Sequence, residues 1–317
     1  MKLALAGDAM LGRAVAAELE QRPRRELVAR EVVEAVAEAD LFVLNLECCI
    51  SDRGRPWPDP AKPFFFRAPP AAAEALAEMG VDCVTLGNNH ALDFGAGALL
   101  DTIEHLRAVG IASVGAGPDA AAARAPVFLD AGGFRLAVVA FGDHPREYAA
   151  GAGRPGIAYA DLAQEPLPAW LPEAVRGEDA DAVLAAPHWG PNMAPEPLPY
   201  VRRAAAALVQ AGAMLVAGHS AHVFQGVAGR VLYDLGDFLD DYAVDPLLRN
   251  DLGLLVVVTL ERDGPRRLEA LPLRLDFCHT RVAGSEDAAW IGRRFRAACA
   301  AFGTEVAEEG GRLVVEL

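Results

Sequence analysis

Short apolar runs alternate along the chain with segments in which apolar residues recur every three to four positions. The apolar runs, typical of buried strands, occupy residues 2–6, 41–46, 82–86, 135–141, 181–186, 213–217 and 230–235. The helical pattern occupies residues 26–38, 70–79, 96–109 and 197–211, and several of these segments begin with Pro or Asp and end with Gly. This alternation predicts an α/β fold with buried strands.

The pattern changes after about residue 250. An apolar run, the turn Asp-Gly-Pro and a second run predict a hairpin with alternating faces, followed by a helix over 286–302 and a last strand in the sequence RLVVEL. No linker composition separates this tail from the rest of the chain. We therefore expect residues 1–250 to form the core of one domain and residues 251–317 to complete that same domain.

Polar residues stand where five of the predicted strands end. They are Asp8, Glu47, Asn89, His90, His188, His219 and His222. In open α/β sheets the loops at the carboxyl ends of the strands converge on one crevice, so these groups are expected at one edge. Carboxylates, an asparagine amide and imidazoles are donors that a two-metal centre uses. The sequence therefore predicts a metal site at that edge.

The segment Gly-Asn-Asn-His at residues 87–90 has two interpretations. It would be a purely structural turn if Asn and Gly served only to adopt left-handed backbone conformations. As part of a site, Asn89 would give its side-chain oxygen to a metal, and His90 would act as general acid. Asp93 lies close enough in the sequence to orient the His90 ring.

The two acidic candidates carry different weight. Glu47 follows a mostly apolar run, where an unpaired carboxylate is costly, so a cation is its natural partner. A buried arginine, Arg13 or Arg67, would serve as well. Asp8 follows the first predicted strand, a common position for a metal ligand, although Gly-Asp turns are also frequent.

The remaining histidines indicate a metal site more strongly together than any one of them does alone. His219 and His222 stand three residues apart in a loop that begins with glycine, a spacing that can place both rings on neighbouring metals. A pair of unrelated surface histidines is the alternative. His188 alone would be interpreted as a core histidine. Asp143 and His144 also follow a strand, and we expect a structural or substrate-facing role for them and not ligation.

Composition narrows the class of partner. The chain of 317 residues is 53% apolar and 23% charged with a net charge of −15, which predicts a globular protein and disfavours nucleic acid as a partner. The first apolar run is too short for a secretion signal, and the longest run falls below the ~18 residues that a membrane span needs. Five cysteines, two of them adjacent, are typical of reduced thiols. We expect a cytoplasmic protein without a membrane span, acting on a small-molecule or peptide-like substrate.

Several separated motifs together resemble a known family. GDAMLGR, LNLE, FFFRAPP, LGNNHALDFG, VGAG, PHWG, GHSAHVFQG and LYDLGDF, in this order, are similar to the CapA family of capsule and poly-γ-glutamate synthesis proteins. That family looks like a branch of the calcineurin-like metallophosphoesterases. The resemblance implies a four-layer αββα sandwich of the metallo-dependent phosphatase type with a two-metal site at the sheet edge.

By motif position, the resemblance also implies roles for individual residues. Asp8 corresponds to the first ligand, Glu47 to the carboxylate that bridges or flanks the metals, and Asn89 to the amide ligand. His90 corresponds to the catalytic histidine. The remaining ligands would be His188, His219 and His222.

This sequence departs from the superfamily pattern at two places. Met10 stands where metallophosphoesterases usually carry a histidine, and the usual Gly-His-His-Pro-His has become Gly-His-Ser-Ala-His. Each departure removes one imidazole. One metal would therefore be weakly held or absent.

Three hypotheses for function follow. The first is a metal-dependent hydrolase that attacks a phosphoester with a metal-activated water, using one or two divalent ions, with Mn, Fe or Zn favoured by the mixed oxygen and nitrogen donors. The second is a metal-dependent enzyme that acts on a peptide or γ-glutamyl substrate, by amide processing or by epimerisation at an α-carbon. The third is a non-catalytic binding protein with a degenerate site.

Overall fold

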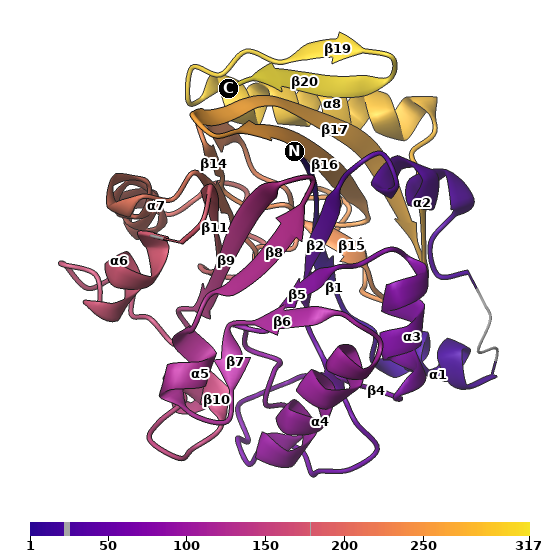
Figure 1. Cartoon of the computed structure of the whole chain (residues 1–317). Helices are drawn as coiled ribbons and strands as arrows, with labels where there is room; N and C mark the ends of the chain where they lie inside the picture. The colour runs from indigo at the N-terminus through magenta and orange to yellow at the C-terminus, as the bar shows by residue number, and fades with distance from the viewer. Residues whose placement is uncertain (22–25, 178) are drawn as a thin grey trace.

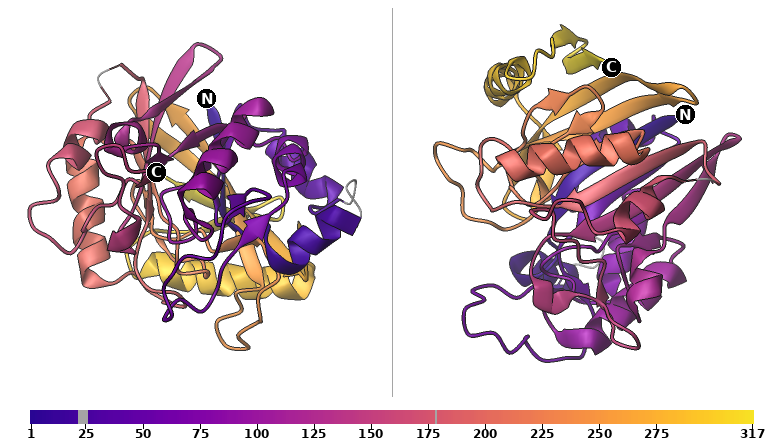
Figure 2. Two further views of the ribbon diagram at one scale, coloured as in Figure 1. Left: turned by 90° about the horizontal axis from the view of Figure 1, so that it is seen from below. Right: turned by 90° about the vertical axis from the view of Figure 1, so that its left-hand side faces the viewer.

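Two β-sheets packed face to face form the centre of the protein, and helices cover their outer faces (Figure 1; Figure 2). The computed structural model describes residues 1–21, 26–177 and 179–317. No helix in these three ranges combines the length and the apolar character that crossing a bilayer requires.

The first sheet holds the N-terminal strands and the C-terminal tail. Its strand order within the described residues is β19-β20-β17-β16-β1-β2-β5-β6, with β15 also paired to β1 and β18 to β17. These strands are β1 (Lys2–Ala9), β2 (Leu41–Leu46), β5 (Cys83–Thr85), β6 (Ala112–Val114), β15 (Asp237–Leu239), β16 (Leu252–Glu261), β17 (Gly264–Asp276), β18 (His279–Val282), β19 (Ala307–Glu309) and β20 (Arg312–Glu316). Strands β1, β2, β5 and β6 run parallel, whereas β16 pairs antiparallel with β1.

The second sheet comes from the middle of the chain. Its order is β13-β14-β12-β11-β9-β8, formed by β8 (Val127–Ala131), β9 (Phe134–Gly142), β11 (Ala182–His188), β12 (Leu215–Ala217), β13 (Val227–Ala228) and β14 (Val231–Leu232). Two short ladders join β3 (Cys49–Ile50) to β4 (Arg67–Ala68) and β7 (Ala116–Gly117) to β10 (Gly156–Ile157). Strands β9, β11 and β12 are parallel, so their carboxyl ends share one edge.

The helices occupy the two outer layers and one end of the sandwich. Helices α1 (Arg13–Gln21), α2 (Arg30–Val36), α3 (Ala71–Glu78) and α4 (Gly95–Ala108) lie on the side of the first sheet. Helices α5 (Ala120–Arg124), α6 (Trp170–Val175) and α7 (Pro199–Ala211) lie on the side of the second sheet. Helix α8 (Ser285–Ala300) lies next to β19 and β20, and one turn of 3₁₀-helix spans Arg146–Tyr148.

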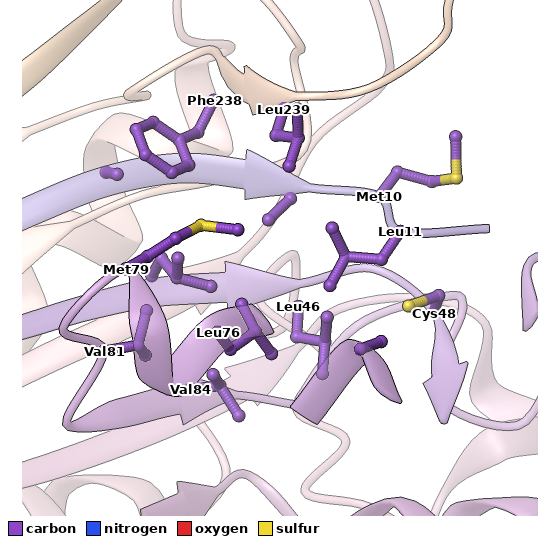
Figure 3. Close-up of a cluster of buried hydrophobic side chains, with 14 of the residues drawn as sticks. Met10, Leu11, Leu46, Cys48, Leu76, Met79, Val81, Val84, Phe238 and Leu239 are labelled. Atoms are coloured by element: carbon purple, nitrogen blue, oxygen red, sulfur yellow. The ribbon is translucent and has the colours of Figure 1, made fainter. Parts of the chain in front are cut away.

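Side-chain alternation in β1 shows how the layers arise. Leu3 and Leu5 pack into the apolar core between the two sheets, while Ala4 and Ala6 pack into the core beneath the helices. A third core lies between the second sheet and α6 and α7. Figure 3 shows part of the helix-side core, where Leu76 of α3 lies near Leu46 of β2. Three apolar layers between four layers of backbone make an αββα sandwich.

The structure corrects three sequence predictions. Strand β16 is buried on both faces and not on alternate ones, because it lies between β1 and β17 with both cores against it. The helix expected from residue 26 begins only at Arg30, because Leu27 and Ala29 exchange backbone hydrogen bonds with Thr280. The strand expected over 230–235 is limited to β14, because the Asp234 carboxylate accepts the backbone N–H groups of two loop residues.

Gly7 holds β1 against the loop before β15. A Cβ atom at this position would lie 1.8 Å from the carbonyl oxygen of Gly236, which accepts the N–H of Asp8. We expect Gly7→Ala to lower the free energy of unfolding by about 1–3 kcal/mol or more, because packed backbone must move. Gly97→Ala in α4, which meets nothing within 4 Å, is the control and is expected to stabilise by about 0.5–1 kcal/mol. Chemical denaturation measures both, and equal effects would contradict the close approach.

Candidate metal centre

The ends of five strands bring the candidate residues to one edge of the sandwich. Asp8 lies at the end of β1, and Glu47 follows β2. Residues 88–90 follow β5, His188 ends β11, and residues 219–222 follow β12. A backbone bridge between His188 and His219 continues the pairing of β11 with β12 into the site. The convergence expected from the sequence is present in the structure.

Asp8, Glu47 and His222 form the centre of the cluster. Each offers one donor atom, these atoms all lie within 4.8 Å of one another, and all three residues are buried. His219 Nδ1 lies 3.1 Å from Asp8 Oδ1, and His188 Nε2 lies 3.4 Å from Glu47 Oε1. Five of the six expected ligands therefore lie together around Asp8 and Glu47.

Several donor atoms in this cluster are buried without a partner. Among the described residues, neither carboxylate oxygen of Glu47 accepts a hydrogen bond, and His219 Nδ1 is likewise unpaired. The sixth expected ligand, Asn89, joins none of the contacts above, but its Oδ1 is also buried and unpaired. His219 Nδ1 is close to Asp8 but makes no well-directed hydrogen bond with it. Because unpaired buried polar atoms are costly, this donor set fits a divalent cation.

The two arginines considered as alternative partners of Glu47 are engaged elsewhere. Arg13 pairs with Asp241 through its guanidinium. The Arg67 guanidinium lies 4.4 Å from the centroid of the Phe94 ring and donates to the backbone oxygen of Arg53. The cation that Glu47 needs is therefore not supplied by either side chain.

The electrostatics of the two carboxylates differ. Burial raises the pKa of Glu47 well above its ordinary value, and the charge of Asp8 raises it further. Burial also raises the pKa of Asp8, but the close approach and charge of His219, together with the charges of His188 and His222, outweigh burial and lower that pKa. The imidazoles thus outweigh burial at Asp8, whereas at Glu47 the opposing charge of His222 is too weak to outweigh burial.

His90 is held by a carboxylate that the protein fixes from several sides. His90 Nδ1 lies 2.7 Å from Asp93 Oδ2, which also accepts the backbone N–H of Phe66. Asp93 Oδ1 lies 3.0 Å from Lys62 Nζ and accepts a hydrogen bond from the hydroxyl of Tyr148. With Nδ1 occupied, Nε2 is the ring atom left to meet a substrate. Burial lowers the pKa of His90 and outweighs the opposing effect of Asp93.

Two buried asparagines complete the scaffold and were not assigned roles from the sequence. Asn45 donates to Asp8 Oδ1 at 2.8 Å, and the same amide nitrogen lies 3.3 Å from His188 Nδ1. Asn88 donates to Asn45 Oδ1 and accepts the backbone N–H of His90. The asparagines therefore tie the predicted ligands to the predicted general acid. Asn45 stands two residues before Glu47 and Asn88 directly before Asn89, and this proximity in the sequence was the available signal.

Asp237 is a further residue of the cluster that the sequence prediction omitted. It lies on β15 opposite Asp8 in the parallel pairing with β1, and its Oδ1 lies 2.8 Å from His222 Nδ1. A carboxylate behind an imidazole ligand fixes the orientation of the ring. The signal was present, since Asp237 follows a strand and a glycine in the motif LYDLGDF.

Met10 and Ser220, which stand where the sequence departs from the expected histidine pattern, both have well-defined contacts. Met10 is fully buried in the helix-side core, and its Sδ accepts the backbone N–H of Gly12 (Figure 3). Ser220 donates its hydroxyl to the carbonyl of Gly190, and its backbone N–H to Asp8 Oδ2 at 3.3 Å. Each of these side chains is therefore committed to the fold.

His144 lies beside the cluster although the sequence placed it outside the ligand set. Its ring centroid is 5.5 Å from that of His188, and its Nδ1 contacts Asp143 Oδ1. Asp143 in turn accepts hydrogen bonds from the Tyr200 hydroxyl at 2.9 Å and from the backbone N–H of Gly190. The site thus has a third imidazole held by a carboxylate, after His90 and His222, and Tyr200 contacts Asp143 as Tyr148 contacts Asp93.

The amino-acid sequence is similar to those of several known proteins. A family model described as "Bacterial capsule synthesis protein PGA_cap" matches residues 2–242. A probable polyglutamine synthesis accessory protein of Mycobacterium tuberculosis is 31% identical over 293 residues, covering 84% of this chain and 74% of that protein. The capsule biosynthesis protein CapA of Bacillus anthracis is 28% identical over 286 residues, covering 87% of this chain and 67% of that protein.

A solved structure shares the fold. The crystal structure of a novel phosphatase from Mycoplasma pneumoniae aligns with a TM-score of 0.53 at 12% identity, covering 86% of this chain and 93% of that one. The expected four-layer sandwich of the metallo-dependent phosphatase type is thereby confirmed.

Proposed function

We propose that this chain, which belongs to the bacterial capsule synthesis protein family PGA_cap, is a metal-dependent hydrolase of the phosphoesterase type. The observation that carries the proposal is the Glu47 carboxylate, which is fully buried with both oxygens unpaired among the described residues and lies within reach of Asp8 and His222. A buried carboxylate that accepts no hydrogen bond destabilises the folded state, so its presence indicates a bound cation and not a role in packing.

The residues would divide the work as follows. Divalent ions at the site would activate a water molecule and neutralise charge on the phosphoryl group. The donors that would hold them are Asp8, Glu47, Asn89, His188, His219 and His222. Asn45 and Asp237 would fix the orientation of Asp8 and His222. His90, held through Nδ1 by Asp93, would present Nε2 to the leaving-group oxygen and donate a proton to it.

A metal assay and a substrate panel test this proposal. Protein purified without chelator is expected to contain about one to two Mn, Fe or Zn ions per chain and to hydrolyse 4-nitrophenyl phosphate or bis(4-nitrophenyl) phosphate. Treatment with EDTA should abolish turnover, and returning the metal should restore it. His188→Ala should lose metal, whereas His279→Ala, which replaces a histidine on β18, should not. Protein with no bound metal would favour a non-catalytic binding protein.

A second function is favoured by the names of the relatives. One relative is named a probable polyglutamine synthesis accessory protein and another a capsule biosynthesis protein, and the first name suggests peptide-like or γ-glutamyl chemistry. The same donors would then polarise an amide carbonyl, and His90 and His144 would be the imidazoles available for proton transfer. Release of glutamate from γ-glutamyl peptides, or exchange of an α-proton with deuterated solvent, by metal-loaded protein that leaves every phosphoester intact would select this function.

A further inference from the structure

A cavity of about 450 Å³ opens beside the candidate metal centre. Its lining includes His90 and His222, together with Arg13, Phe64, Phe66 and Tyr242. Because the proposed general acid and one proposed metal ligand share this lining, a molecule in the cavity would lie next to the reacting group. The volume suits a small organic group.

Three aromatic rings form an apolar wall in the cavity. The Phe66 ring lies 4.2 Å from the His90 ring and 5.8 Å from the Tyr242 ring, measured between centroids. Phe64 stacks on Phe66 at 6.3 Å with an interplanar angle of 11°, and 54% of its surface is exposed. A large exposed ring that extends a buried aromatic wall toward solvent is typical of a binding surface.

The charge of Arg13 in this wall is compensated within the protein. Its Nε donates to both Asp241 oxygens, at 2.9 and 3.2 Å, and its guanidinium lies 5.1–5.8 Å from the centroids of Phe64, Phe66 and Tyr242. Asp241 also accepts the backbone N–H of Ala14. Arg13 is the one arginine or lysine among the described residues that line the cavity. The cavity therefore presents a flat apolar surface, and the positive charge of Arg13 is balanced by Asp241.

We propose that this cavity is the subsite for the organic part of the substrate, and that it takes a flat, uncharged group of one or two rings. This inference rests on the proposed function, because the reacting phosphoryl group would lie at the metal centre. A group with several negative charges does not fit, since such groups are bound by clusters of uncompensated arginine and lysine side chains. A ring that stacks against Phe64 and Phe66 would bury apolar area on both partners.

Binding of simple phosphonates, measured by calorimetry on the full chain supplied with Mn²⁺, tests the subsite without turnover. Phenylphosphonate is expected to bind about tenfold more tightly than methylphosphonate, because the ring leaves water for an apolar wall. The 4-carboxyphenyl compound should lose most of that gain. Phe64→Ala should reduce the preference for phenyl several-fold and leave methylphosphonate binding unchanged. Leu100→Ala, which removes an exposed apolar side chain from α4, should behave as wild type.

The outcomes separate the subsite from the proposed function. Equal affinity for phenyl- and methylphosphonate, tighter binding of the 4-carboxyphenyl compound, or no measurable binding of phenylphosphonate would each overturn the subsite. Turnover of phenyl phosphate is measured in parallel. If phenylphosphonate binds with the expected preference and phenyl phosphate is not hydrolysed, the subsite stands and the proposed phosphoesterase activity fails.

Discussion

Replacing Glu47 by glutamine is expected to stabilise the metal-free protein and to remove the stabilisation that metal binding gives to the wild type. In the metal-free state the Glu47 carboxylate is buried beside Asp8 with both oxygens unpaired among the described residues. Glutamine has nearly the same shape and carries no charge. Removing a buried charge whose oxygens accept no hydrogen bond is expected to raise the free energy of unfolding by about 1–3 kcal/mol.

With metal bound, we expect the wild type to be more stable than Glu47→Gln. A ligand at 100 to 1,000 times its dissociation constant stabilises the folded state by roughly 3–4 kcal/mol, so the wild type should gain about that much. The variant should gain much less, because it has lost a carboxylate that lies 3.4 Å from His188 and within 4.8 Å of donor atoms of Asp8 and His222. Thermal and chemical denaturation, with EDTA and with Mn²⁺ or Zn²⁺, measure all four states. Glu31→Gln on the exposed face of α2 is the control and should change little in either condition.

The pH dependence of the metal-free comparison has a definite sign. Glu47 has a folded-state pKa raised well above the ordinary value of 4.5, so above pH 4.5 the folded state binds more protons than the unfolded state. The contribution of Glu47 to stability therefore falls as the pH rises from 4.5 through the folded pKa. Glutamine does not titrate, and the advantage of Glu47→Gln should grow over that range. If Glu47→Gln were less stable than the wild type in EDTA at every pH, hydrogen bonds from the protein to the Glu47 carboxylate would be indicated, and the prediction would be wrong.

The strand ends that carry the site were predictable for a physical reason. Strands β1, β2, β9 and β11 are covered on both faces, so each reads as an apolar run, and the first polar residue after the run marks the sheet edge. Because the parallel strands share that edge, Asp8, Glu47 and His188 could be grouped before any contact was known.

Other parts of the site lie beyond such a pattern. Asp237 joins the cluster because β15 pairs with β1, and a pairing between positions 8 and 237 has no periodicity to indicate it. Lys62 reaches Asp93 from a loop and Tyr148 from a single 3₁₀ turn, and the conformations of both segments follow from tertiary contacts. The failed expectation of alternating faces for β16 has the same origin, since the sequence does not show that a second core covers its other face.

Replacing His90 by glutamine is expected to lower kcat by about 10²–10⁴-fold with little change in metal content. In the structure His90 Nδ1 is held by Asp93, and the ring lines the cavity next to the centre, which suits proton donation to a leaving group. Asp93→Asn should cause a smaller loss, because the imidazole remains but its orientation and tautomer are no longer fixed. His105→Gln on α4 replaces a histidine outside the site and should leave turnover unchanged.

The dependence on the leaving group identifies the role of His90. A general acid matters most when the departing oxygen is basic, so the loss in His90→Gln should be largest with phenyl phosphate and much smaller with 4-nitrophenyl phosphate. The measurement is kcat/KM for a series of substituted phenyl phosphates with wild type, His90→Gln and Asp93→Asn, with metal content determined for each. A uniform loss across the series would contradict proton donation and indicate that His90 contributes only to binding. A loss of bound metal would instead make His90 a ligand, because the imidazole would then be holding the cation through the nitrogen that Asp93 leaves free.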